Sequence, residues 1–385
     1  MNVIGQKVLS VFKEKFSSVP TMYFSPGRIN LIGEHIDYNG GFVMPAAIDK
    51  GIYYAIASNS SESIHIYSID FNEQLFVDIR DIKKLTGWKN YVLSVVNELL
   101  LSGKAIKGFD CVFGGDIPAG AGMSSSAAVE GGLAFALNEI FNTGMSRTDL
   151  ALLCQRAEHG FPGVNCGIMD QFANMMGKRD QVILLDCRNL VYEYLPMKMP
   201  GHQIVLFNTK VHHTLASGEY NKRRNQCEEG MMKLKAKMNI NSFRDIRKPE
   251  DLDAYRSILG DEVYYRCLYV VGEIHRTIQA AEYLKHQNLN DLGRLMYETQ
   301  EGLSKLYNVS CAELDFLVQQ ARLNPAVIGS RLMGGGFGGC TINIVKETAM
   351  KDFIAMSSLA YEKEFGIVPE AYIVEISEGT GIINC

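Results

Sequence analysis

Hydrophobic and polar positions along the chain follow two different periods. Apolar residues at every second position, with many β-branched and aromatic side chains, predict strands, whereas apolar positions three or four residues apart predict helices. In the first half, strands are expected at residues 108–114 and 181–187. A hairpin is expected at residues 51–70, because a polar turn there divides two apolar runs.

Helical patterns alternate with these strands. A helix is expected at residues 124–141, and a capping box at 146–149 opens another that should reach about residue 159. A short helix is expected to begin near Asp170 and end at Gly177. The N-terminal segment, MNVIGQKVLSVFKEKF, is a further amphipathic helix candidate.

The residue pattern of the predicted helices changes after Pro196, where long charged helices replace the apolar ones. We therefore place a domain boundary near residue 195, which gives domains at 1–195 and 196–385. Strands mixed with helices in both parts indicate an α+β or α/β class. Beyond the boundary, strands are expected at 202–208, 340–346 and 371–376, and helices at 222–238, 262–287 and 311–322.

Composition and charge limit the functions that need to be considered. The 385 residues include 47% hydrophobic and 21% charged residues, as in a globular protein, and the formal net charge is −5. This balance supplies no basic field for nucleic acid and no polybasic face for a membrane. No apolar run is long enough to cross a bilayer, and the N-terminus lacks the pattern of a signal peptide. We therefore expect a cytoplasmic protein. Its oligomeric state is unknown, with a monomer slightly favoured.

A glycine- and serine-rich segment lies between the strand at 108–114 and the following helix. It reads GGDIPAGAGMSSSAA from Gly114 to Ala128. Glycines at 120 and 122 let the backbone approach a ligand, and the helix start offers free N–H groups with about +0.5 of partial charge. This pattern favours a phosphate site, although an ordinary glycine turn with serine caps is an alternative. The G-K-[ST] of a Walker A loop is absent from the sequence.

Charged and polar residues gather in a second glycine-containing segment, SPGRINLIGEHIDYNGG at 25–41. Arg28, Glu34, His35 and Asp37 lie within ten residues of one another. Side chains of both signs on a bent segment suit a polyhydroxylated ligand, because carboxylates accept hydrogen bonds from hydroxyls and histidine can donate or accept. A surface turn with local ion pairs is the alternative.

Two further carboxylates are candidates for chemistry. Asp170 follows a glycine-containing loop at the start of a short helix, where it could cap the helix or deprotonate a hydroxyl nucleophile. Glu158 lies at the end of the preceding helix. Since Mg²⁺ prefers hard oxygen ligands and keeps several waters, one carboxylate, one hydroxyl and nucleotide oxygens would suffice to bind it.

Taken together, these segments resemble the GHMP small-molecule kinases, and within them the galactokinase branch. The serine-rich loop, the segment PGRINLIGEHIDYNGG and the segment RLMGGGFGGCTINIV at 331–345 match the three motifs of that family. The contiguous GEHxDYNxG is specific to the galactokinase branch. The resemblance implies an N-terminal domain of the ribosomal-protein-S5-like type and a C-terminal ferredoxin-like domain, with ATP and sugar in the cleft between them.

The resemblance also implies roles for individual residues. Asp170 is expected to be the catalytic base facing the C1 hydroxyl of galactose, with Arg28 as the cation beside it. The expected galactose contacts are Glu34, His35, Asp37, the backbone at Gly167, and Tyr220. The glycines from Gly334 to Gly339 are expected to form a scaffold near the phosphate loop and the sugar.

ATP and Mg²⁺ are expected as co-substrate and cofactor. Ser126 and Glu158 resemble the Mg²⁺ ligands, and Trp88 and Tyr91 the residues that line the adenine pocket, with Ser68 as a further candidate. The triphosphate would lie in a cradle formed by Gly120, Ala121, Gly122, Met123, Ser124, Ser125 and Ser126.

The implied reaction is transfer of phosphate from ATP to α-D-galactose, giving α-D-galactose 1-phosphate and ADP. Three alternatives are a kinase of N-acetylgalactosamine or arabinose, a galactose sensor without turnover, and a nucleotide-binding structural protein. Known sensors of the family lose alanines after the serine run, whereas Ala127 and Ala128 are present here. This difference argues against the sensor.

Overall fold

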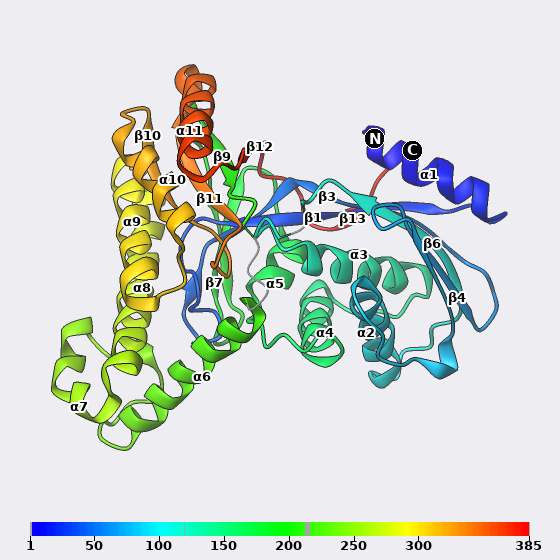
Figure 1. Cartoon of the computed structure of the whole chain (residues 1–385). Coiled ribbons are helices and arrows are strands. Elements are labelled where there is room, and N and C mark those ends of the chain that lie inside the picture. The colour runs from blue at the N-terminus through cyan, green and yellow to red at the C-terminus, as the bar shows by residue number, and fades with distance from the viewer. Residues whose placement is uncertain (1, 119, 212–215, 385) are drawn as a thin grey trace.

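The computed structural model describes residues 2–118, 120–211 and 216–384, although only the backbone of residues 216 and 217. Helices and strands are mixed throughout, as the sequence predicts. Helices α2 to α5 lie beneath one large sheet, and a second sheet with long helices stands beside it (Figure 1).

The large sheet has six strands in the order β13-β1-β3-β6-β4-β5. Neighbouring strands are antiparallel except for β4 and β6, which are parallel. Its strands are β1 (Thr21–Asn30), β3 (Pro45–Ser58), β4 (Ser63–Ser68), β5 (Glu73–Asp78), β6 (Phe109–Gly115) and β13 (Gly381–Ile382).

The predicted hairpin at residues 51–70 is wrong. Both apolar runs form strands, but β6 lies between β3 and β4 and pairs with each of them. The polar turn at 59–62 therefore crosses over the end of a third strand, β6. Gly108 packs against this turn, and a Cβ at Gly108 would lie 2.3 Å from the Ser63 carbonyl oxygen. Local periodicity predicts that a segment is a strand, whereas the choice of partner depends on residues far along the chain.

Apolar side chains cover both faces of this sheet. On one face lies α1 (Val3–Lys15), which buries Val8 and Phe12 completely, as its amphipathic pattern predicts. The other face carries the apolar helices that precede or follow the phosphate loop, and the predicted positions of α3, α4 and α5 are confirmed. These helices are α2 (Trp88–Leu101), α3 (Ser125–Ile140), α4 (Arg147–Gly160) and α5 (Met169–Met176).

The second sheet has the order β10-β11-β9-β12, with helices on both faces. The predicted strands and charged helices of this part are confirmed to within a few residues, apart from the start of α6. The strands are β9 (His202–Asn208), β10 (Val327–Leu332), β11 (Cys340–Lys346) and β12 (Glu370–Val374). The helices are α6 (Ala216–Lys235), α7 (Arg256–Leu259), α8 (Asp261–Lys285), α9 (Leu289–Glu301), α10 (Ala312–Leu323) and α11 (Met350–Phe365).

A small third sheet and several short helices complete the described structure. The sheet contains β2 (Phe42–Val43), β7 (Gln181–Asp186) and β8 (Tyr192–Pro196). One of the short helices, η4, is a π-helix. The short helices are η1 (Ile79–Asp81), η2 (Phe243–Asp245), η3 (Pro249–Tyr255), η4 (Gly302–Tyr307) and η5 (Glu347–Ala349).

The two large sheets share one hydrophobic cluster. Ile29 and Leu31, at the end of β1, pack in the same cluster as Leu206 and Ile342 of the second sheet. The chain also returns at its end, because β13 pairs with β1. The boundary near residue 195 stays a prediction. No helix among residues 2–118, 120–211 and 216–384 is long and apolar enough to cross a membrane.

Candidate active site

The centre of the site is an ion pair between Arg28 of β1 and Asp170 in the first turn of α5. The Nε atom of Arg28 donates to Oδ1 of Asp170 at 2.8 Å, and Nη2 donates to Oδ2 at 3.0 Å. Arg28 is 4% exposed, whereas the side chain of Asp170 is 28% exposed. This bidentate pairing fixes the position of the carboxylate while leaving it open to a ligand.

The phosphate loop contacts the same pair. Gly122 has a φ of +69° and Ser124 a φ of +59°, so the backbone turns back on itself just before α3 begins. Arg28 donates through Nη1 to the Gly122 carbonyl, and the Met123 carbonyl accepts from the Arg28 backbone N–H. Ser124 directs its hydroxyl to Asp170 instead of capping α3. Loop, cation and carboxylate therefore form one constellation.

The third glycine-rich segment packs against this loop. A Cβ at Gly122 would lie 2.9 Å from the Met333 carbonyl oxygen, and a Cβ at Gly339 would lie 3.2 Å from that of Gly120. Backbones approach this closely only where side chains are absent. The expected packing of the third motif on the phosphate loop is confirmed.

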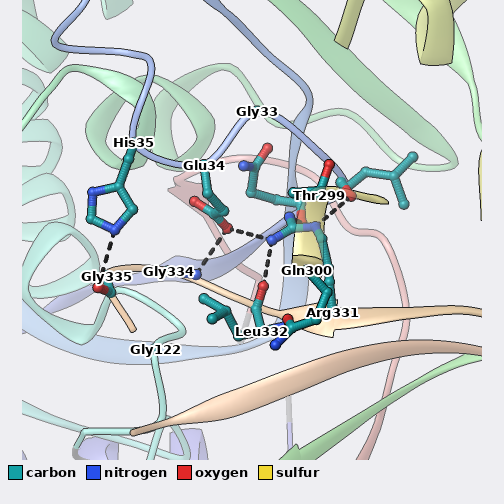
Figure 2. Close-up of polar contacts among 12 residues, drawn as sticks. Gly33, Glu34, His35, Gly122, Thr299, Gln300, Arg331, Leu332, Gly334 and Gly335 are labelled. Atoms are coloured by element: carbon teal, nitrogen blue, oxygen red, sulfur yellow. Dashed lines mark hydrogen bonds and ion pairs between the residues drawn. The ribbon is translucent and has the colours of Figure 1, made fainter. Parts of the chain in front are cut away.

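Glu34 joins the first motif to the third (Figure 2). Its Oε1 atom accepts hydrogen bonds from the Gly334 N–H at 2.8 Å and from Nη1 of Arg331 at 3.1 Å. Arg331 is fully buried, and it also donates to the carbonyls of Asn30, Leu31 and Leu332. Since Oε1 is held by two donors, Oε2 is the oxygen that Glu34 can offer to a ligand.

A cavity opens beside these residues. All the residues that the sequence assigns to sugar binding line it, including the glycine whose backbone was expected to take part. Its lining includes Arg28, Asp170, Glu34, His35, Asp37, Gly167 and Tyr220.

Gly167 lies directly against the side chain of Asp37. A Cβ at Gly167 would lie 1.8 Å from Oδ2 of Asp37, so only glycine fits beside this carboxylate. Burial raises the pKa of Asp37 to about 7, and the negative charge of Asp170 adds to the effect. Three carboxylates thus face one cavity, and of these Asp170 pairs with Arg28 and Glu34 with Arg331.

Ser126 and Glu158, the predicted metal ligands, also lie together. The Gln171 side chain donates a hydrogen bond to the Glu158 carboxylate at 2.6 Å, and the Ser126 hydroxyl lies near enough to oppose the effect of burial on the pKa of Glu158. Glu158 is 6% exposed, and burial raises its pKa to about 7. Within the described part of the chain, no group of three or more His, Cys, Asp and Glu side chains is suited to a metal. A cation here would have one carboxylate and one hydroxyl, together with ligands from outside the chain.

The predicted adenine residues lie at the start of α2 and the end of β4. Trp88 stacks on Phe71 with ring centroids 6.3 Å apart, and its Nε1 donates to Glu73. Ser68 is fully buried, and its hydroxyl accepts a hydrogen bond from the Phe71 backbone N–H. Tyr91 lies one turn further along α2, and burial, together with the charge of Glu158, raises its pKa to about 12.

Comparison with known proteins identifies the family. The galactokinase galactose-binding signature matches residues 10–58, and the models for the GHMP kinase N-terminal and C-terminal domains match residues 90–178 and 280–356. The galactokinase of Clostridium acetobutylicum is 40% identical over 390 residues, covering 100% of this chain and 99% of that protein. The galactokinase of Bacillus subtilis is 42% identical, with 96% of each chain covered. This chain belongs to the galactokinase family.

Solved structures of the galactokinase family and of related kinases have the same fold as this chain. The crystal structure of Lactococcus lactis galactokinase complexed with galactose matches with a TM-score of 0.95 and 33% identity, over 98% of this chain and 99% of that one. A mevalonate kinase matches with a TM-score of 0.66 at 21% identity, which indicates the shared GHMP fold alone. The predicted two-part α+β fold is confirmed.

Sequence reasoning overlooked two residues that contact the predicted site residues of this galactokinase-family chain. Arg331 was not given a role, although a charged residue inside the apolar strand VIGSRL was a signal of a buried pairing partner. Phe71 was also overlooked, and its 56% exposure beside Trp88 appears only in the structure.

Proposed function

We propose that this chain is an ATP-dependent kinase that phosphorylates α-D-galactose at its C1 hydroxyl, releasing ADP and α-D-galactose 1-phosphate. The observation that carries the proposal is the position of Asp170. Its carboxylate lies on the wall of the sugar cavity and is joined through Arg28 and Ser124 to the phosphate loop.

Asp170 would orient the C1 hydroxyl and accept its proton as the phosphoryl group is transferred. Phosphoryl transfer depends on positioning and on neutralising charge more than on covalent chemistry. Arg28 is suited to both tasks, because it holds the Asp170 carboxylate in place and lies next to the loop that would hold the phosphates. The N–H groups at the start of α3 add further positive potential.

Three groups would recognise the sugar hydroxyls. Glu34 presents one free carboxylate oxygen, and Asp37 presents a second carboxylate across the cavity. Tyr220 of α6 brings a hydroxyl from the second half of the chain. Acceptors and a donor at fixed positions suit a polyol, since each hydroxyl can both donate and accept.

Mg²⁺ fits the pair formed by Ser126 and Glu158. Both offer hard oxygen atoms, and a cation would relieve the cost of ionising the buried carboxyl of Glu158. The ion would supply charge neutralisation on the nucleotide phosphates. Trp88, Tyr91 and Phe71 would hold the adenine ring by stacking and packing.

A sugar panel tests the function. ADP release would be measured with galactose, N-acetylgalactosamine and arabinose, each with ATP and Mg²⁺. We expect turnover with galactose at a kcat/KM at least tenfold above that of either other sugar. Faster turnover of another sugar would favour the alternative kinases, and galactose binding without ADP release would favour the sensor. A cytoplasmic location and a monomeric state stay predictions.

A further inference from the structure

A chain of hydrogen bonds runs from the sugar cavity into the second half of the molecule. Its members are buried or half-buried, and none is a residue to which the proposed reaction assigns a step. Nδ1 of His35 lies 2.7 Å from the Tyr38 hydroxyl, which lies 2.8 Å from the Tyr307 hydroxyl. The Tyr307 hydroxyl in turn lies 3.1 Å from Sγ of Cys227. The far end of the chain is therefore a thiol of α6.

The direction of every hydrogen bond in this series follows from the protonation of His35, at its cavity end. The Nε2 atom of His35 lies 3.1 Å from the Gly335 carbonyl oxygen (Figure 2). A carbonyl can only accept, so Nε2 carries a proton. Burial lowers the pKa of His35 to about 4, so the ring is neutral and Nδ1 must accept. Tyr38 then donates to His35, Tyr307 donates to Tyr38, and the Cys227 thiol donates to Tyr307.

The π-helix η4 carries Tyr307 into this series of hydrogen bonds. The carbonyls at its C-terminal end have no partner within the helix, and two buried arginines bind them. Arg223 of α6 donates to the carbonyls of Tyr307 and Asn308 at 2.9 and 2.8 Å, and Arg266 of α8 donates to that of Leu306. Helices α6 and α8 thereby hold the Tyr307 hydroxyl in position.

The ring held by this chain is a structural part of the sugar cavity. Both nitrogens of His35 are bonded within the protein, one of them to Gly335 in the third motif. Gly335 lines the cavity and lies beside Tyr220. A neutral, fixed ring therefore joins the first motif to the third without adding a second positive charge next to Arg28.

We propose that Tyr38 and Tyr307 are positioning residues for the sugar cavity, acting through a hydrogen-bond chain that starts at Cys227 and holds His35 in its Nε2–H form. This inference rests on the proposed function, because it assigns the cavity to the sugar. It predicts that the loss of one hydroxyl changes sugar affinity while leaving the groups that act on phosphate in place.

Kinetics of Tyr38→Phe, Tyr307→Phe and Tyr264→Phe test the positioning role. Tyr264 is the matched control, because it is 6% exposed and its hydroxyl binds Asp253, outside the chain of hydrogen bonds. We expect the galactose KM to rise roughly 5- to 20-fold in Tyr38→Phe and by a smaller factor in Tyr307→Phe, with kcat and the ATP KM within about twofold of wild type. A wild-type galactose KM in Tyr38→Phe, or an equal rise in Tyr264→Phe, would overturn the proposal.

The tautomer of His35 can be measured in the unaltered protein, which avoids any variant that folds poorly. Long-range ¹H–¹⁵N correlation spectra of histidine-labelled protein, with His35 assigned by its absence in His35→Asn, are expected to show a protonated Nε2 and a bare Nδ1 between pH 6 and 8. A protonated Nδ1 would refute the bond directions. This readout does not depend on turnover, so failure of wild-type protein to phosphorylate galactose would defeat the proposed function separately.

Cys227 allows a conservative rescue. Cys227→Ser keeps a donor to Tyr307 and should leave the galactose KM within about twofold of wild type, whereas Cys227→Ala removes the donor and should raise it about two- to fourfold. Equal values for the two variants would remove Cys227 from the chain.

Discussion

At the scale of single residues, the site depends on pairings between distant positions. Arg28 and Asp170 are 142 residues apart, and Glu34 and Arg331 are 297 apart. In each pair a buried arginine holds a carboxylate in place through hydrogen bonds. Removing one partner leaves the other charge buried and unpaired, which costs more than the pair contributes.

Asp170→Asn should lower kcat by roughly 10²–10⁴-fold, because an amide cannot accept the C1 proton, while ATP affinity stays near wild type. Nucleotide titration and steady-state assays would measure the two effects. Asp186→Asn is the matched control, since Asp186 is 9% exposed and pairs with Arg244 at 2.7 Å in the third sheet. If both variants lost turnover equally, the effect of Asp170→Asn would be structural.

Asp37 should make stability depend on pH. Its pKa is raised from 3.8 to about 7, so the folded protein keeps this proton over a range in which the unfolded chain releases it. The contribution is fully present below about pH 4 and is lost as the pH rises through 7. Asp37→Asn should remove that loss, so the unfolding free energy of the variant relative to wild type should increase by up to about 4 kcal/mol between pH 4 and 8. Denaturant titrations at several pH values would measure it, and a constant difference would contradict the assignment.

At the scale of elements, the decisive feature is the turn that leads into α3. The pattern of glycines and serines predicted a helix start with an open backbone, and α3 begins at Ser125 as expected. The same pattern could not predict that the third motif would cover this turn. A side chain at position 122 would be unfavourable for two reasons: the φ of this residue is positive, and a Cβ would clash with the Met333 carbonyl oxygen.

Gly122→Ala separates those two reasons when compared with Gly144→Ala. Both glycines have a φ of +69°, but a Cβ at Gly144 would meet open space. Each variant should lose about 1 kcal/mol of stability from the backbone conformation. Only Gly122→Ala should also displace the phosphate loop, raising the ATP KM by roughly tenfold or more. An unchanged ATP KM would show that the loop tolerates the added methyl group.

At the scale of the whole molecule, the end of the chain supports helix α5. Thr380, fully buried, precedes β13, and its hydroxyl is 2.8 Å from Oδ1 of Asn174 and 3.1 Å from the Ser25 hydroxyl. Asn174 belongs to α5, which carries Asp170. The C-terminal residues thus connect α5 to β1, the strand that carries Arg28.

Thr380→Val should lower the free energy of unfolding by about 1–3 kcal/mol, because it removes a hydroxyl from a buried network without changing its volume much. Thr348→Val, at an exposed position in η5, is the control and should change stability by less than about 0.5 kcal/mol. Equilibrium denaturation would compare the two. Equal stabilities would mean that water replaces the missing hydroxyl.

The sequence by itself predicted many of the helices and strands, the open helix start near residues 120–126 and the candidate residues that line the cavity, because these depend on periodicity and on short contiguous motifs. Tertiary structure decided the rest. It inserted β6 between β3 and β4, paired Arg331 with Glu34, and brought Tyr307 to His35 through a π-helix. These features join residues that are far apart in the chain, and the cost of burying each polar group is met only when its partner arrives through folding.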